Sequence, residues 1–409
     1  DGGEPLPPSP PNPASTPERG IARLRPLRMV ALGSSVNGNT DICCRAWHDL
    51  GNSFLLVGAG ENSENTAFAP LSTLERGEFF VCGGHMDSRA LLERVEAFQP
   101  DAIMSGGWNI PSSYRQVMKR VRPPALRIMF MDTVWQSTAK QWVGRGIHPF
   151  VIDPLFDVAF VPGERTEFLA RRLGFGPDDI IRGAYTADTP LFDSGPRSGE
   201  ELASWRRFLF VGRLMSFKGL DVLARAYRQY RAVAPEPWEL HIVGIGPEQR
   251  RFGGAGGVTM HGFLQQSELA ALMHESSSLV LPSQGEHFGI VVHEAAAAGL
   301  PLLVSETAGA VPGLLQDGYN GWAVPDGDVA AWAGSLQRMS GQSPERLGEM
   351  SRVSRALSTR LSPSGWARNL HDEIERRRTN GPPSSPRAFH RPSGSNPPRW
   401  SSSRGGGDN

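Results

Sequence analysis

Short apolar segments alternate with polar, helix-compatible segments along most of this chain. This alternation is typical of a parallel sheet whose strands are joined by crossover helices. We therefore predict an α/β fold, with strands at residues 29–32, 54–57, 79–82, 102–104, 128–131, 158–161 and 180–183, and again at 208–211, 240–243, 258–261, 279–282 and 302–304.

The alternation is interrupted at residues 188–204, a segment rich in proline and glycine. A chain of 409 residues also exceeds what one hydrophobic core usually organises. We predict two doubly wound, Rossmann-like domains at residues 27–195 and 196–362, followed by a helix at 363–378. The tails at 1–26 and 379–409 are dominated by residues such as Pro, Ser and Gly, which predicts disorder.

Charge and cysteine content narrow the functional classes. Lys plus Arg and Asp plus Glu both total 42, so no global positive charge recruits nucleic acid. Cys43, Cys44 and Cys82 lack metal-ligand spacing, which predicts reduced core thiols.

No run approaches the ~20 apolar residues of a membrane span, and no signal peptide is recognisable. We predict a cytoplasmic protein, with peripheral membrane contact left open. Because the chain does not begin with methionine, it could be a fragment.

Two carboxylates eight residues apart, Glu286 and Glu294, form the most informative motif. They surround a predicted helix start at the carboxyl end of a strand, where open α/β sheets bind ligands. The amides of Gly289 and Ile290 would favour a diphosphate there. If both glutamates were helical, they would lie roughly 12 Å apart, about the length of a nucleotide diphosphate sugar. Carboxylates at this spacing also occur by chance on solvated helices, but the flanking strands argue against chance.

Further candidates follow the strands at 208–211 and 240–243. Arg213 and Lys218 each stand beside a glycine, and both side chains suit phosphate oxygens. Two solvated surface cations are the alternative interpretation. Gly244 and Gly246 also suit a nucleotide, but the third glycine of the dinucleotide fingerprint is absent, so a NAD-linked dehydrogenase is the weaker hypothesis.

On these residues the sequence resembles the retaining, nucleotide-sugar-dependent glycosyltransferases of family 4, which have the two-domain GT-B fold. The resemblance covers roughly residues 28–378 and is strongest in the second half. It rests on Gly212-Arg213 with Lys218-Gly219, on the run from Val243 to Pro247, on Glu286 with Glu294, and on Ser305 to Gly309 with Asn320-Gly321.

The resemblance implies transfer of a hexose from a nucleotide diphosphate sugar with retention of anomeric configuration. It assigns the donor diphosphate to Arg213 and Lys218, the donor sugar to Glu286 and the ribose to Glu294. It also implies an acceptor-side first domain, a nucleotide-sugar-binding second domain, and a last helix that crosses back to the first. No cofactor or metal is expected, and the acceptor could be a glycan, a lipid-linked sugar or a small molecule.

The sequence departs from the family pattern in two places. The usual Gly-Gly-x-Pro-Glu run reads Gly309-Ala-Val-Pro312-Gly313, without the glutamate. In the first half, Asp132 stands where family members often carry an acceptor-side histidine. Asp132 could replace that histidine as a catalytic group, or it could simply cap the following helix.

Three loops of the first half hold weaker candidates. Gly33 and Ser34 could meet an acceptor or a phosphate, although a tight turn with a helix cap explains them as well. His85 and Asp87 also follow a strand but rank below Glu286, because a cap explains them more simply. Trp108 could stack on a sugar, although an aromatic residue there is more often core.

Other functional classes remain open alternatives. A GT-B epimerase or phosphorylase shares the fold and the phosphate contacts but transfers no sugar to a separate acceptor. A catalytically silent sugar-binding module is a further alternative, which the presence of both glutamates and both cations disfavours.

Overall fold

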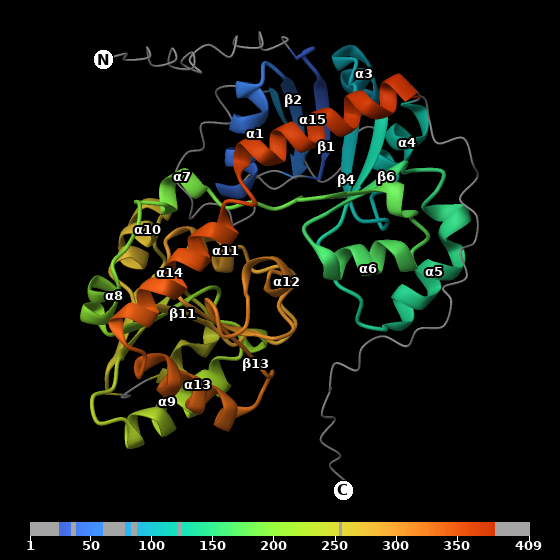
Figure 1. Cartoon of the computed structure of the whole chain (residues 1–409). Helices are drawn as coiled ribbons and strands as arrows, with labels where there is room; N and C mark the ends of the chain where they lie inside the picture. Colours follow the sequence, from blue (N-terminus) through green and yellow to red (C-terminus); the bar gives the residue numbers. More distant parts are fainter. Residues whose placement is uncertain are drawn as a thin grey trace, which may run out of the picture.

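The protein forms two parallel sheets, each covered by helices on both faces (Figure 1). The computed structural model describes residues 24–33, 38–59, 78–82, 88–121, 125–252 and 256–380. Ser34, His85 and Asp87 lie outside the described residues, so their predicted roles stay predictions.

The first sheet has seven strands in the order β3-β2-β1-β4-β5-β6-β7, all parallel. The order runs outward from β1 in both directions, so a topological switch point lies between β1 and β4. The strands are β1 (Arg28–Leu32), β2 (Ser53–Ala59), β3 (Glu78–Cys82), β4 (Ala102–Gly106), β5 (Leu126–Phe130), β6 (Val158–Val161) and β7 (Ile180–Arg182).

The second sheet has six parallel strands in the order β10-β9-β8-β11-β12-β13. They are β8 (Arg207–Val211), β9 (Glu239–Val243), β10 (Val258–Gly262), β11 (Ser278–Leu281), β12 (Leu302–Ser305) and β13 (Gly321–Val324). The twelve predicted strands are confirmed, with shifted ends. The edge strand β13 was not predicted, because its four residues form no apolar run long enough to stand out.

Helices join successive strands and cover the sheets. In the first half they are α1 (Gly38–Asp49), α3 (Ser88–Phe98), α4 (Ser112–Arg120), α5 (Ala139–Val151), α6 (Glu164–Arg172), α7 (Thr189–Phe192) and α8 (Gly199–Trp205). The second half contains α9 (Leu220–Val233), α10 (Gln266–His274), α11 (Ile290–Ala297), α12 (Val311–Leu314), α13 (Val329–Ser340), α14 (Pro344–Ser358) and α15 (Pro363–Asn380). Short 3-10 turns lie at Pro177–Asp179, Ser216–Lys218 and Pro247–Phe252.

The last helix, α15, lies across the first sheet rather than the second (Figure 1). Its Trp366 is buried, with the ring centroid 6.5 Å from that of Trp47 in α1 and 6.0 Å from that of Phe160 in β6. Burying aromatic area of this kind contributes more to stability than surface charges do. Apolar packing therefore anchors the end of the chain to the first domain.

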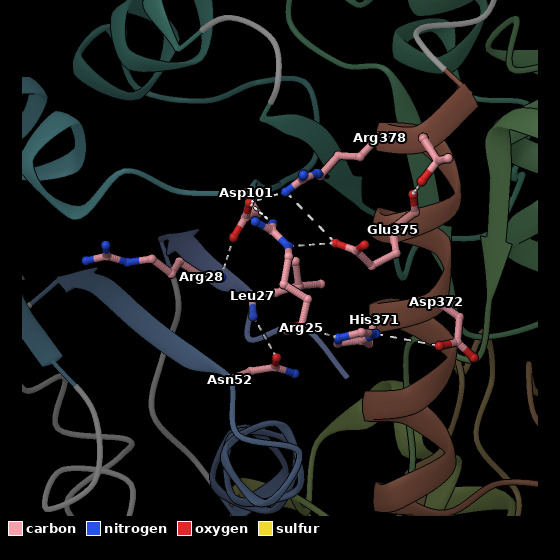
Figure 2. Close-up of polar contacts among 10 residues, drawn as sticks. Arg25, Leu27, Arg28, Asn52, Asp101, His371, Asp372, Glu375 and Arg378 are labelled. Atoms are coloured by element: carbon pink, nitrogen blue, oxygen red, sulfur yellow. Dashed lines mark hydrogen bonds and ion pairs between the residues drawn. The ribbon is translucent and has the colours of Figure 1, made fainter. Parts of the chain in front are cut away.

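Ion pairs join the far end of α15 to the segment that enters β1 (Figure 2). The carboxylate of Asp101 lies 2.5 Å from an Arg25 nitrogen and 2.9 Å from Nη1 of Arg378. It also accepts the Arg28 backbone N–H at 2.9 Å. Glu375 completes the group at 3.2 Å from Arg25 Nε. The group fixes where α15 ends relative to the first sheet.

Candidate active site

The structure brings Arg213 and Lys218 together around one aromatic ring. Both follow β8, and the Arg213 guanidinium carbon and the Lys218 Nζ lie 6.0 and 5.4 Å from the ring centroid of Phe217. Lys218 also forms an ion pair with Glu286, which follows the neighbouring strand β11. Only 13% of either side chain is exposed in that pair. The lysine predicted to bind phosphate and the glutamate predicted to bind the sugar thus meet at one edge of the sheet.

Glu286 lies outside the helix, so the condition for a spacing of roughly 12 Å along a helix axis is not met. Helix α11 begins only at Ile290, and Gly289 before it has a φ of 87°. That left-handed conformation favours glycine and turns the chain before the helix starts. Glu286 therefore sits in the preceding loop, and only Glu294 is helical. The amides of Ile290 and Val291, at the start of α11, follow the turn.

The loop after β12 holds the Glu286 loop in place. The backbone N–H of Gly309 donates to the Glu286 carbonyl at 3.1 Å, and that of Ala310 to the Phe288 carbonyl at 2.9 Å. A Cβ on Gly309 would lie 1.8 Å from the carbonyl oxygen of His287. Only glycine permits this approach. Packing therefore explains why glycine stands at position 309, the first position of the run that differs from the family pattern, whether or not that run ends in a glutamate.

Glu294 is buried against the linker between the two sheets. Burial raises the pKa of its carboxyl to about 7, and the negative charge of Asp188 adds to the rise. Asp188 in turn forms an ion pair with Arg45 of α1, at 3.1 Å. Glu294 is therefore a carboxyl that can hold a proton near neutral pH while both domains contribute to its surroundings.

The neighbouring His293 is a structural residue that the sequence did not single out. Its Nδ1 accepts the Ala187 backbone N–H at 2.9 Å, and its Nε2 lies 3.0 Å from the Ser358 carbonyl, so Nε2 carries the proton. Burial lowers the pKa of His293 to about 4. The neutral imidazole joins α11 to both chain segments that cross between the domains. No spacing pattern in the sequence pointed to this role.

Gly244 and Gly246 are required by close packing of two loops. Their φ angles are 131° and 154°, and a Cβ on them would lie 1.9 Å from the Gly212 carbonyl oxygen and 2.4 Å from that of Leu214. The two glycines hold the chain after β9 against the chain that carries Arg213. Their predicted contact with the nucleotide stays a prediction.

Asp132 faces a cavity of about 810 Å³ at the carboxyl edge of the first sheet. Its Oδ2 accepts a hydrogen bond from the Tyr185 hydroxyl at 3.2 Å. It does not cap the next helix, because Thr138 fills that position with Gln141 in a capping box. The capping interpretation is therefore wrong. Burial raises the pKa of Tyr185, and the negative charge of Asp132 raises it further. The Tyr185 hydroxyl therefore stays protonated and continues to donate its hydrogen bond to Asp132.

Gly33, Trp108 and Ile290 also line this cavity, so it reaches from the first sheet to the start of α11. Gly33 has a φ of 79° and donates its N–H to the Val57 carbonyl at 2.7 Å. Tyr185 completes the bridge, because its ring lies 5.6 Å from that of Phe288 in the Glu286 loop. Of the donor-side candidates, Ile290 lines this cavity, whereas Arg213, Lys218, Glu286 and Glu294 are not among its lining residues.

Cys43 and Cys44 are buried on α1, and burial raises the pKa of both thiols. They are therefore poor nucleophiles at neutral pH.

Among the described helices, none has the length and apolarity that crossing a bilayer demands.

Known proteins resemble this chain in sequence over its second half and in fold over most of its length. Residues 206–342 match the family model described as glycosyl transferases group 1. The D-inositol 3-phosphate glycosyltransferase of Corynebacterium aurimucosum is 29% identical over 214 residues, which cover 45% of this chain and 48% of that protein. The glycogen synthase of Mycobacterium tuberculosis is 33% identical over 175 residues, covering 40% and 41%. The chain thus spans about half the length, or less, of these relatives.

Solved structures match over a larger share of the chain. Anabaena HepE in complex with UDP and glucose superposes with a TM-score of 0.66 at 13% identity, covering 86% of this chain and 100% of that one. The sucrose-phosphate synthase of Thermosynechococcus elongatus gives 0.65 at 18%, covering 87% and 100%. At such identities the likeness shows the fold, which is GT-B. The resemblance drawn from the motifs is confirmed at the level of group 1 glycosyl transferases.

Proposed function

We propose that this chain, a relative of the group 1 glycosyl transferases with their GT-B fold, transfers a hexose from a nucleotide diphosphate sugar to an acceptor, with retention at the anomeric carbon. The observation that carries the proposal is the ion pair between Lys218 and Glu286, beside Arg213 and before the amino end of α11. A cation for phosphate and a carboxylate for a sugar hydroxyl stand in contact at the point where the two halves of such a donor would meet.

Donor binding would rearrange this pair. Diphosphate oxygens would attract the ammonium group of Lys218, and the carboxylate of Glu286 would then be released to accept hydrogen bonds from sugar hydroxyls. Arg213 and the first amides of α11 would stabilise charge on the departing phosphate. Glu294, deeper on the same helix, would accept hydrogen bonds from the ribose.

In the proposed reaction, the bond from the anomeric carbon to the donor phosphate oxygen breaks and a bond to the acceptor oxygen forms on the same face. The acceptor proton passes to the departing phosphate oxygen, so a separate general base is not needed. Asp132, held by Tyr185, would orient the acceptor hydroxyl. The cavity on the first domain favours a separate acceptor, and therefore a transferase over an epimerase.

A screen of nucleotide diphosphate sugars tests the proposal. We expect one donor to raise the thermal midpoint of the protein, to be hydrolysed slowly alone, and to be consumed faster with an acceptor. Nuclear magnetic resonance of the product should show the anomeric configuration of the donor. An inverted product would contradict retention, and rapid donor conversion without any acceptor would favour the epimerase or phosphorylase alternative.

A further inference from the structure

Helix α5 lies at the outer edge of the first domain (Figure 1). One of its faces is uncharged and apolar, and its large side chains are exposed to solvent. Residues three, four and seven apart share a helix face, and here that face carries Ala139, Val143, Gly146 and Phe150, with Trp142 beside them. The exposed fractions are 81% for Phe150, 56% for Val143 and 51% for Trp142. A surface helix normally turns such side chains inward. This arrangement therefore marks an interaction surface.

Packing on the opposite face fixes the rotation of α5. A Cβ on Gly144 would lie 2.9 Å from the indole of Trp108, and one on Gly174 would lie 2.3 Å from the imidazole of His148. These two glycines let the helix approach its neighbours closely. Turning Val143 and Phe150 inward would give up both contacts. The exposed apolar face is thus built into the fold.

Two arginines border this face. The guanidinium carbon of Arg145 lies 5.7 Å from the ring centroid of Trp142, and that of Arg172 in α6 lies 6.0 Å from the same ring and 4.7 Å from that of Phe168. Within the part of the chain that the structure describes, neither guanidinium forms an ion pair, and the buried Nε of Arg172 has no hydrogen-bond partner. Two like charges side by side favour an anion.

We propose that the α5 face, defined as Trp142, Val143 and Phe150 with Arg145 and Arg172, docks on an anionic lipid bilayer. The helix would lie in the plane of the interface, with its apolar side chains about 5 to 10 Å deep and its guanidinium groups at the lipid phosphates. The charges favour a bilayer over a second copy of this chain. A symmetric contact through this face would bring the same unpaired arginines together.

The position of the face connects it to the acceptor-side cavity. Thr138, Lys140 and Gln141, at the start of α5, line that cavity, and Trp108 both lines it and supports the helix. Docking would therefore hold the cavity close to the lipid surface, where an acceptor with a lipid anchor could enter. This consequence rests on the proposed function, whereas the docking itself does not.

Co-sedimentation of the full chain with phosphatidylcholine vesicles, with and without phosphatidylglycerol, tests the proposal. We expect binding to the anionic vesicles that weakens as salt is added. Replacing Val143 and Phe150 together by serine should weaken binding by about tenfold or more, and Arg145→Glu should also weaken it. The matched controls lie on α9 of the other domain, where Val233→Ser and Arg228→Glu change an exposed apolar and an exposed basic residue.

Three outcomes would overturn the proposal. One is failure of the parent chain to bind anionic vesicles. Another is equal loss of binding in the α9 controls. The third is a dimer in light scattering that the Val143 and Phe150 substitutions dissociate, which would assign the face to a second copy. Calorimetric binding of a nucleotide diphosphate, measured on every variant, separates these outcomes from failure of the proposed function.

Discussion

Nδ1 of His293 accepts the backbone N–H of Ala187 at 2.9 Å, and so joins helix α11 to the linker between the domains. The next residue, Glu294, is buried as well, and burial moves the two pKa values in opposite directions, to about 4 for the imidazole and about 7 for the carboxyl. The two neighbours therefore impose opposite pH dependences on stability.

The direction in which stability changes with pH follows from which state, folded or unfolded, binds more protons. Between pH 4.5 and about 7 the folded state holds a proton on Glu294 that the unfolded chain releases, so stability falls as pH rises. Between about pH 4 and 6.5 the unfolded chain protonates His293 and the folded state does not, so stability falls as pH falls. In the parent protein the two effects largely cancel where they overlap.

We predict that single substitutions separate them. In the His293→Gln variant only the Glu294 carboxyl still makes stability depend on pH, so this variant should gain stability as the pH is lowered from about 7 to 5. In the Glu294→Gln variant only the His293 imidazole does so, and this variant should lose stability as the pH falls from about 6.5 to 4. Either change can reach roughly 3 kcal/mol. Urea unfolding across this pH range measures both, and parallel slopes in the two variants would refute the assignment.

A second prediction concerns the donor diphosphate. Arg213→Ala or Lys218→Ala should weaken nucleotide diphosphate binding by about 1.5 to 3 kcal/mol, because each removes a charge-assisted hydrogen bond. Isothermal titration calorimetry measures the loss, and circular dichroism checks that the fold persists. Arg228→Ala, an exposed arginine on α9, is the control and should bind like the parent. Unchanged affinity in both test variants would reject the diphosphate assignment.

The third prediction separates the two glutamates kinetically. Glu294→Gln should chiefly raise KM and weaken binding of the free nucleotide, because the ribose contact is the same in ground and transition states. Glu286→Gln should spare nucleotide binding and lower kcat, since its contacts strengthen as charge develops on the sugar. Steady-state kinetics with the donor found in the screen measures both. If both variants matched the parent, the central assignment would fail.

Tyr185 supplies a fourth prediction. Tyr185→Phe removes the hydrogen bond to Asp132 and keeps the ring that packs against Phe288. The loss should lower kcat by about five- to thirtyfold and leave nucleotide binding intact, because only the acceptor-side carboxylate loses its orientation. Asp132→Asn should show the same pattern. A defect in nucleotide affinity instead would place Tyr185 on the donor side.

The fifth prediction tests how the Glu286 loop is held. Gly309→Ala would drive a methyl group into the His287 carbonyl, so we expect about 1 to 3 kcal/mol of destabilisation together with lost activity. Gly313→Ala is the matched control four residues on, where a Cβ meets nothing within 4 Å. Thermal unfolding compares the two. Equal stability of both variants would show that the loop yields without cost.

The sequence alone determined the class of fold. Strands buried on both faces must be apolar throughout, and crossover helices must separate them, so the run of strands from β1 to β12 was readable in order. Arg213, Lys218 and Glu286 were identifiable because each follows such a strand, and the ends of parallel strands meet at one edge. Local composition encodes both features.

Only the tertiary structure decided how these residues meet. The turn at Gly289 takes Glu286 out of the helix, and its ion pair with Lys218 joins residues 68 positions apart in the chain. The contact of His293 with Ala187 spans 106 positions. The ion pair depends on how the loops after β8 and β11 pack within the second domain, and the His293 contact depends on how that domain packs against the linker. Hydrophobic periodicity carries no information about such long-range packing. The local sequence therefore encodes the order of strands and helices, whereas the polar contacts within the site arise only from the tertiary structure.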